Sequence, residues 1–257
     1  MQDKNIKIGL VCSGNEVARK SALILKSKYK FVRPTQADVI VALGGDGTVL
    51  ETLHKFLKQK IPIYGMNRGH IGFLMNEYSE KNLLTRLRKS KSTKLYPLRI
   101  KSFLNNGSIK ESIAFNDVSL IRDTRQIAKI CIEINNTKKI DQLLCDGCLI
   151  STPAGSSAYN LSLRGPVFPV EAQLLALTPI SPYRPRRWRG ALLPNNVKIT
   201  LTALEVKKRP VRAEADFFET NNIKKLEVAL DKKQFVNLLF DQGHDLEERI
   251  INEQFLY

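Results

Sequence analysis

The sequence predicts an α/β domain with a parallel sheet, followed by a β-rich domain of sandwich type. Over roughly the first hundred residues, short apolar runs alternate with amphipathic helical patterns, whereas beyond Pro97 the apolar residues recur with period two. With 257 residues, 43% of them hydrophobic, the chain is long enough to bury the cores of two domains. We therefore place the α/β domain at 1–97, the β-rich domain at 98–240 and a final helix at 241–257.

The first domain follows the strand–helix order of a doubly wound sheet. The run at 37–43 is almost wholly apolar, as expected of a parallel strand that is covered on both faces. Further strands are predicted at 6–11 and 61–66. Helical spacing of apolar residues predicts helices around 17–25 and 49–57, and a third helix around 83–87 with Ser79 as its cap.

The second domain is predicted from alternation and turn chemistry. Asn106-Gly107 lies between two strand-like runs and is typical of a hairpin turn. Alternating apolar residues then mark strands at 130–134, 197–201, 211–215 and 226–230. In the tail, Leu246 and Ile250, and likewise Ile251 and Phe255, lie four residues apart. This spacing predicts a short helix that packs back on the first domain.

Net charge and hydropathy limit the classes of binding partner and the cellular compartment that we expect for this protein. A formal net charge of +16 favours an acidic partner, which could be nucleic acid, a membrane surface or a phosphorylated small molecule, and 184–189 (RPRRWR) is the densest basic cluster. The N-terminus lacks the layout of a signal peptide, and no apolar run reaches the roughly 18 residues of a membrane span. We expect a cytoplasmic protein without a membrane partner.

Four cysteines in a chain of this length do not indicate a disulfide framework. Cys145 and Cys148 form a C-x-x-C, but no second such pair is present and the three histidines are scattered. Reduced structural thiols are therefore favoured over a zinc site.

A glycine-rich loop, Gly-Gly-Asp-Gly-Thr with Asp46 at its centre, joins the buried strand at 37–43 to the next helix. Ligands of open α/β sheets bind beyond the carboxyl ends of strands, where glycines and a helix N-terminus admit phosphate. A carboxylate at such a place would repel phosphate unless it binds Mg²⁺ or accepts a proton or hydrogen bond from a hydroxyl. These are tasks of phosphoryl transfer. The alternative is a tight turn with Asp46 as the helix N-cap.

Three further segments carry polar residues that could bind a ligand. The loop at 67–74 contains two glycines, and Asn116-Asp117 interrupts a β-like run as either a turn or a ligand clamp. The stretch 146–162 combines a carboxylate, several hydroxyls and Tyr159, which can bond to ribose and base edges or form a plain surface loop.

Taken together and in this order, these motifs resemble the NAD kinase family. The matching blocks are GGDGT, NRGHIGFL, FND followed by VSLIR, DGCLISTPAGSSAYNLS and LTPISPYRPRRWRGALLP. The similarity is greatest to alphaproteobacterial members, particularly through RPRRWR. The resemblance implies the family's α/β plus β-rich fold and an ATP-dependent phosphorylation of the adenosine 2′-hydroxyl of NAD to give NADP. It also implies a divalent metal such as Mg²⁺ and a homo-oligomer, a dimer or tetramer, with no nucleic-acid partner.

The same resemblance assigns site residues. Asp46 is the expected general base, and Gly47 is a binding position beside it. The remaining expected NAD-binding residues are Asn116, Asp117, Asp146, Ala154, Ser157, Ala158, Tyr159, Asn160, Leu161 and Ser162.

The chain departs from the family pattern at several of these places. Asp117 is one methylene shorter than the usual glutamate, and Ser157 replaces a common threonine. Leu144 stands where a basic residue is often found, so a phosphate contact is absent or supplied from elsewhere. Two alternatives remain: a lipid or diacylglycerol-type kinase, which also carries GGDGT, and a basic nucleic-acid-binding protein.

Overall fold

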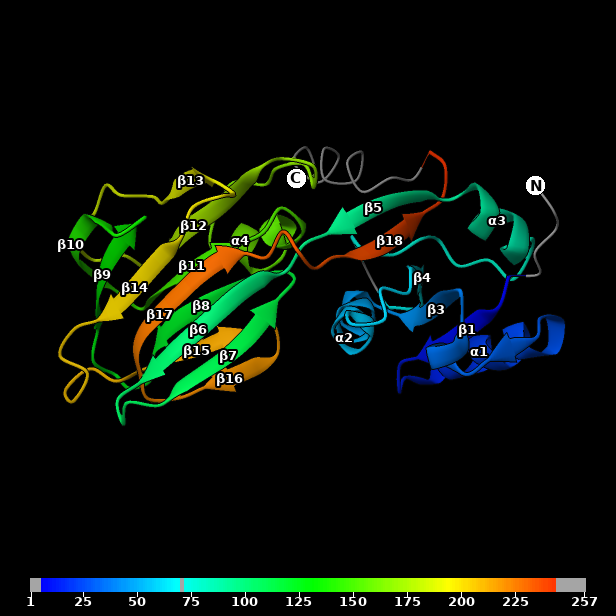
Figure 1. Ribbon diagram of the computed structural model, residues 1–257, viewed down its shortest axis with the longest axis horizontal. Coiled ribbons are helices and arrows are strands. Elements are labelled where there is room, and N and C mark those ends of the chain that lie inside the picture. The colour runs from blue at the N-terminus through cyan, green and yellow to red at the C-terminus, as the bar shows by residue number, and fades with distance from the viewer. Residues whose placement is uncertain (1–5, 70–71, 244–257) are drawn as a thin grey trace. The chain divides into compact units, whose positions relative to one another are not determined.

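The structure, a computed structural model, describes residues 6–69 and 72–243, and the chain forms two compact units. Unit 1 contains the chain up to Leu95 and resumes at Gln234, and unit 2 comprises Tyr96–Lys233. Unit 1 is an α/β unit and unit 2 is β-rich, which confirms the predicted fold class (Figure 1).

Unit 1 is built on one six-stranded sheet with the order β2-β1-β3-β4-β18-β5. Strands β2, β1, β3, β4 and β18 run parallel, and β5 runs antiparallel to β18. Its elements are β1 (Ile8–Cys12), α1 (Glu16–Lys28), β2 (Phe31–Val32), the 3₁₀ turn η1 (Pro34–Gln36), β3 (Val39–Gly44), α2 (Asp46–Phe56), β4 (Ile63–Asn67), α3 (Leu83–Lys89), β5 (Lys91–Leu95) and β18 (Val236–Phe240).

Burial explains why these segments form a covered parallel sheet. All six residues of β3 are buried, as expected of a central strand with both faces covered. Helix α1 begins after Asn15, whose side chain accepts a hydrogen bond from the backbone N–H of Ala18. The buried face of α1, including Leu25, belongs to the same apolar core as β3.

The third helix begins later than the sequence predicts. Its N-cap is Asn82, in the left-handed conformation, and the helix starts at Leu83. Ser79 instead accepts a hydrogen bond from the backbone N–H of Lys81, which closes a local turn. The prediction of Ser79 as the cap was therefore wrong.

The C-terminal boundary of the β-rich domain also differs from the prediction. We expected that domain to continue to residue 240, but β18 lies in the sheet of unit 1. The fully buried Asn76 explains this, because its side chain donates to the carbonyls of Gly65 and Leu239 and accepts from the N–H of Asp241. A period-two pattern gives no information about which sheet a strand joins.

Unit 2 contains two six-stranded antiparallel sheets, ordered β10-β9-β14-β17-β6-β7 and β13-β12-β11-β8-β15-β16. Their elements are β6 (Leu98–Leu104), β7 (Ile109–Ala114), β8 (Asp117–Arg122), β9 (Ala128–Ile134), β10 (Thr137–Cys145), β11 (Gly147–Ser151), the 3₁₀ turn η2 (Ala154–Ser157), α4 (Tyr159–Ser162), β12 (Leu174–Ile180), β13 (Ala191–Pro194), β14 (Ile199–Ala203), β15 (Val211–Ala215), β16 (Phe218–Thr220) and β17 (Ile223–Leu230).

Alternate residues of both sheets form one apolar core, as in a β-sandwich. Leu98 and Ile100 of β6 belong to it, together with Val118 and Leu120 of β8 in the other sheet. The predicted Asn106-Gly107 turn joins β6 to β7, with Gly107 at φ +86°. Unit 2 thus presents β8 and β11 side by side within one sheet (Figure 1).

None of the described helices combines the length and the apolar composition that crossing a lipid bilayer requires. The helix predicted at 241–257 lies, apart from its first residues, outside the described part of the chain.

Candidate functional site

The glycine-rich loop of unit 1 lies between β3 and α2, as the sequence predicts. Gly45 is the N-cap of α2 and Asp46 is its first residue, so Asp46 is not the cap. Gly44 has no room for a side chain, because a Cβ there would lie 2.2 Å from the Thr48 hydroxyl oxygen. The loop therefore turns tightly at the carboxyl end of β3 and brings Asp46 to the start of the helix.

Backbone donors from the 67–74 segment hold the Asp46 carboxylate. One carboxylate oxygen accepts the N–H of Phe73 at 2.8 Å, and the other accepts the N–H of Leu74 at 2.9 Å. A Cβ on Gly72 would lie 3.1 Å from Asp46 Oδ1, so glycine allows this close approach. Two of the predicted motifs thus form one arrangement with an oriented carboxylate at its centre.

Gly45 and Gly47 flank this carboxylate and face open space. A Cβ built on either glycine meets no heavy atom within 4 Å among the residues that the structure describes. Packing against the described residues therefore requires glycine at neither position, in contrast to Gly44. The arrangement is consistent with room for a ligand beside the backbone of the loop.

In unit 2, Asp216 organises the turn that contains Asn116 and Asp117. Its carboxylate accepts the backbone N–H groups of Phe115 at 2.7 Å, Asn116 at 3.0 Å and Asp117 at 3.4 Å. The N–H of Asp216 in turn donates to the carbonyl of Asp117. Asp216 lies at φ +51°, between β15 and β16, where the short polar side chain of an aspartate tolerates the left-handed region.

The same turn is fastened from its other side by Thr152. Its hydroxyl donates to the carbonyl of Phe115 at 2.6 Å and accepts the N–H of Gly155, and its own N–H donates to the carbonyl of Asn116. A Cβ on Gly155 would lie 2.2 Å from that carbonyl oxygen. The backbone is thereby fixed, whereas the buried Oδ1 of Asn116 has no hydrogen-bond partner among the described residues. A ligand N–H or O–H would satisfy it.

Asp117 lies in an environment that disfavours its charge. Burial, followed by the nearby carboxylates of Asp216 and Glu214, raises the pKa of Asp117 to about 7. The carboxyl group is therefore protonated below neutral pH, where it can donate as well as accept a hydrogen bond.

Asp146 lies between β10 and β11, just before the start of the strand that pairs with β8, and it is held by Arg122. The guanidinium Nε of Arg122 donates to Asp146 Oδ1 at 2.6 Å, and the backbone N–H of Arg122 donates to the carbonyl of Asp146. Both side chains are about one-third exposed, so this pair remains accessible to solvent and to a ligand.

Tyr159 lies close to these carboxylates. Its side chain is 42% exposed, and its pKa is raised by burial and then by Glu214, Asp117 and Asp146, in that order. Tyr159 therefore lies near carboxylates from both ends of β11, since Asp117 pairs with Ser151 at the end of that strand and Asp146 precedes Gly147 at its start. A phenol there can pack against a base and can donate a hydrogen bond.

The other predicted residues of the 154–162 stretch have different roles. Ala154 and Ser157 are buried in η2, Ala158 is the N-cap of α4, and Leu161 and Ser162 are exposed on that short helix. Asn160 is fully buried. It donates to the carbonyls of Ser156 and Pro166 and accepts from the Thr178 hydroxyl at 2.6 Å. Asn160 therefore fastens the loop to the sheet.

Two site residues were missed by sequence reasoning. Arg122 was part of a matched block but received no role. Asp216 was not singled out, because an aspartate between two alternating strands has the signature of an ordinary turn residue. Only the tertiary structure shows that its carboxylate reaches a backbone segment about a hundred residues away in the sequence.

No group of three or more His, Cys, Asp or Glu side chains in the described ranges is arranged to hold a metal ion. Cys145 and Cys148 are buried free thiols in the apolar core of unit 2, and burial raises the pKa of Cys145 to about 12. Among the described residues, no further His, Cys, Asp or Glu side chain joins this pair in a group that could complete a zinc site.

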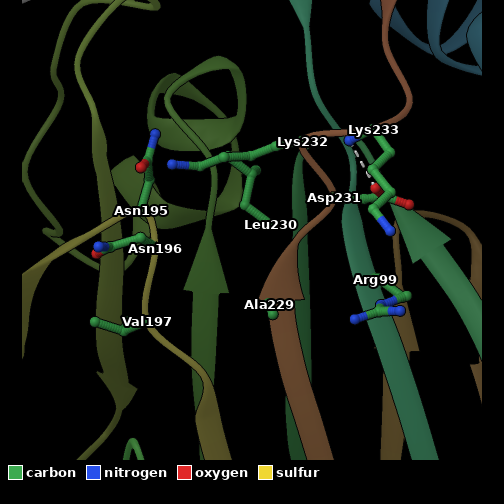
Figure 2. A pocket seen from close by; sticks show the side chains of 9 residues that line it. All are labelled: Arg99, Asn195, Asn196, Val197, Ala229, Leu230, Asp231, Lys232 and Lys233. Carbon is green, nitrogen blue, oxygen red and sulfur yellow. Dashed lines mark hydrogen bonds between the residues drawn. The ribbon is translucent and has the colours of Figure 1, made fainter.

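A hollow of about 290 Å³ lies elsewhere in unit 2, at the end of β17 (Figure 2). Arg99, Lys232 and Lys233 line it together with Asn195 and Asn196, and none of the predicted site residues does.

Comparisons with known proteins identify the family. Residues 7–90 match the ATP-NAD kinase N-terminal domain, and residues 115–216 match the ATP-NAD kinase C-terminal domain. The chain is 47% identical to an NAD kinase of Caulobacter vibrioides, over 97% of this chain and 96% of that protein. It is 45% identical to an NAD kinase of Rhizobium meliloti, over 99% of both.

Solved structures show the same fold at low sequence identity. A yeast NADH kinase complexed with NADH superposes with a TM-score of 0.83 at 19% identity, covering 98% of this chain and 88% of that one. An NAD kinase from Archaeoglobus fulgidus in complex with ATP gives 0.77 at 21% identity, covering 96% and 98%. These matches support neither a lipid kinase nor a nucleic-acid-binding protein. With both family models matched and full-length relatives above 40% identity, the chain belongs to the NAD kinase family.

Proposed function

We propose that the chain transfers the terminal phosphoryl group of ATP to the 2′-hydroxyl of the adenosine ribose of NAD. The observation that carries this proposal is the Asp46 carboxylate, oriented by two backbone N–H groups at the start of α2 and flanked by glycines that face open space. The kinase activity of the named relatives supports the same reaction.

Asp46 is proposed as the general base. As the 2′-oxygen forms its bond to the γ-phosphorus and the bond from that phosphorus to ADP breaks, the hydroxyl proton passes to Asp46. The bonds from Phe73 and Leu74 hold the carboxylate in one orientation, which lowers the entropic cost of reaching the reactive geometry.

The dinucleotide is proposed to bind at the residues that unit 2 gathers. The buried Oδ1 of Asn116 would accept a hydrogen bond from the nucleoside, and Asp117 would bond to a second polar group beside it. Asp146, held by Arg122, and the exposed ring of Tyr159 would complete the contacts. In unit 1, Gly47 would offer its backbone to a ligand beside Asp46, and in unit 2 Asn160 would fix the loop.

Mg²⁺ would be held mainly by the phosphates of ATP, because the described residues form no cage of their own for it. When bound, the ion would neutralise phosphate charge. We further propose a cytoplasmic homo-oligomer without nucleic-acid or membrane partners, which size-exclusion chromatography with light scattering and cell fractionation can test.

The test is an NADP-forming assay with NAD, ATP and Mg²⁺. The native chain is expected to form NADP, and Asp46→Asn is expected to lower kcat by about 10² to 10⁴ while KM changes little. Asp38→Asn removes a carboxylate of the same unit that accepts the N–H of Lys7, and it serves as the matched control. A native-like kcat in Asp46→Asn with an unchanged melting temperature would show that another group accepts the proton.

A further inference from the structure

The connection between β12 and β13 carries an unusual concentration of arginines. Residues 183–189, here called the arginine strap, read Tyr-Arg-Pro-Arg-Arg-Trp-Arg. All four guanidinium-bearing residues are exposed. The function proposed above gives them no role.

The strap is held at both ends. Leu144 of β10 donates its N–H to the carbonyl of Arg184 at 2.8 Å, and its carbonyl accepts the N–H of Tyr183 at 2.7 Å. At the other end, Trp188 is half-buried and packs against the apolar core of unit 2. The arginines between these anchors therefore project from a fixed backbone, which reduces the conformational entropy that a ligand must overcome.

Two of the cations gather around one aromatic ring. The guanidinium carbons of Arg184 and Arg186 lie 5.6 Å and 5.3 Å from the centroid of the Tyr183 ring. Because both distances end at the same centroid, the two guanidinium groups are no more than about 11 Å apart. Two planar cations at this separation suit a ligand with two or three linked phosphates better than a single carboxylate.

No described residue neutralises the strap. None of the guanidinium groups of Arg184, Arg186, Arg187 and Arg189 makes an ion pair or hydrogen bond with another described residue. Elsewhere in unit 2, Arg122, Arg209 and Arg212 are each paired with carboxylates. Four like charges within six residues repel one another, so this arrangement favours an anionic ligand.

The strap is attached beside Asp146, one of the candidate site residues of unit 2. Leu144, to which it is bonded, lies two residues before Asp146, and the N–H of Asp146 donates to the carbonyl of Ile180 just ahead of the strap. In an antiparallel bridge the facing side chains lie about 5 Å apart at Cβ, so Arg184 extends from the position opposite Leu144. Asp146 itself is paired with Arg122 rather than with the strap.

We propose that the arginine strap, chiefly Arg184 and Arg186, binds the linked phosphates of the nucleotide whose nucleoside is held at Asn116, Asp117 and Tyr159. This proposal rests on the function proposed above and adds to it a subsite for a diphosphate or triphosphate. Leu144, which stands where a basic residue is often found in the family, carries no charge. Arg184, which is paired with Leu144 across the strands, would supply the positive charge instead.

The experiment uses the full chain and two double variants. Arg184→Gln/Arg186→Gln removes both charges, and Arg184→Lys/Arg186→Lys keeps them. Arg99→Gln/Lys233→Gln removes two charges from the hollow of Figure 2 and is the matched control. Inorganic tripolyphosphate is titrated calorimetrically at low salt, and KM for ATP and for NAD is measured in parallel. Thermal unfolding checks that the exposed substitutions leave the fold intact.

The glutamine variant is expected to bind tripolyphosphate about tenfold or more weakly and to raise KM for at least one nucleotide similarly, with kcat unchanged. The lysine variant is expected to recover part of the affinity, and the control to match the native chain. Unchanged tripolyphosphate affinity in the glutamine variant overturns the proposal. The proposal is also overturned if the glutamine variant loses binding of tripolyphosphate or duplex DNA while both of its KM values stay native. The strap would then bind a polyanion other than the nucleotide substrates. The titration needs no turnover, so a native chain that forms no NADP would refute the proposed function separately.

Discussion

Replacing Asp216 by asparagine is expected to destabilise unit 2 at the turn that carries Asn116 and Asp117. In the native chain one carboxylate oxygen accepts the N–H of Phe115 at 2.7 Å, and the other accepts the N–H groups of Asn116 and Asp117 at 3.0 and 3.4 Å. An amide keeps only one oxygen, so at least one N–H would face an NH₂ group. Asparagine also tolerates the φ of +51°, which keeps backbone strain out of the comparison.

The magnitude follows from these three bonds. A hydrogen bond to a charged group contributes about 1.5–3 kcal/mol, and the other two bonds weaken when the acceptor loses its charge. The expected total is about 3 kcal/mol, or about 10 °C in melting temperature for a unit of this size. Asp141→Asn, at a carboxylate that is 82% exposed, is the control and is expected to leave the melting temperature unchanged.

The pH dependence separates this explanation from a general loss of packing. At pH 5.5 Asp117 is protonated, because burial and the nearby carboxylates raise its pKa to about 7, and the lost hydrogen bonds act alone. At pH 8.5 Asp117 is charged in the native chain, and removing the Asp216 charge relieves repulsion, so the cost of the substitution should be smaller. Urea unfolding at both pH values measures this difference. Equal costs at the two pH values, or a cost below about 1 kcal/mol at pH 5.5, would refute the reasoning.

Three further outcomes are expected. The raised pKa of Asp117 means that the folded chain loses stability as pH rises from about 4 to about 7, since the unfolded carboxyl ionises first. Asp117→Asn should therefore raise the melting temperature, relative to native, more at pH 8.5 than at pH 4, and a pH-independent difference would contradict this. Asn160→Ala should cost about 3 kcal/mol in urea unfolding because three buried hydrogen bonds are lost, whereas Thr178→Val, which loses one, should cost about 1 kcal/mol. Tyr159→Ala should raise KM for NAD with little change in kcat, and the reverse pattern would argue against a binding role.

The periodicity of apolar residues predicts the α/β unit and the β-rich unit correctly. This works because the burial of a residue depends mainly on which face of its own helix or strand it occupies. The run at 37–43 and the alternating strands beyond Pro97 both have the predicted character. Sheet membership is a different matter, since β18 pairs with β4 and β5 and is also bonded by the side chain of Asn76, which lies more than 160 residues away in the sequence.

The site shows the same division between local and long-range information. The position of Asp46 follows from a local strand–loop–helix pattern, and the structure confirms that arrangement. The raised pKa of Asp117 depends on its burial and then on Asp216 and Glu214, which come from another strand and turn, so no local pattern could predict it. The binding role expected of Asn160 stays a prediction, and its place within a matched block gave no sign of the buried hydrogen bonds that fix the loop.

The pairing of Leu95 in β5 with Val236 in β18 has a consequence for synthesis of the chain. Every residue of unit 2 leaves the ribosome before the strand that lies between β4 and β5 is made. Until β18 is synthesised, β4 and β5 therefore each have an unpaired strand edge, while unit 2 can already fold. A chain that stops at residue 233 should retain a folded sandwich but expose those edges, and would be prone to aggregate through them.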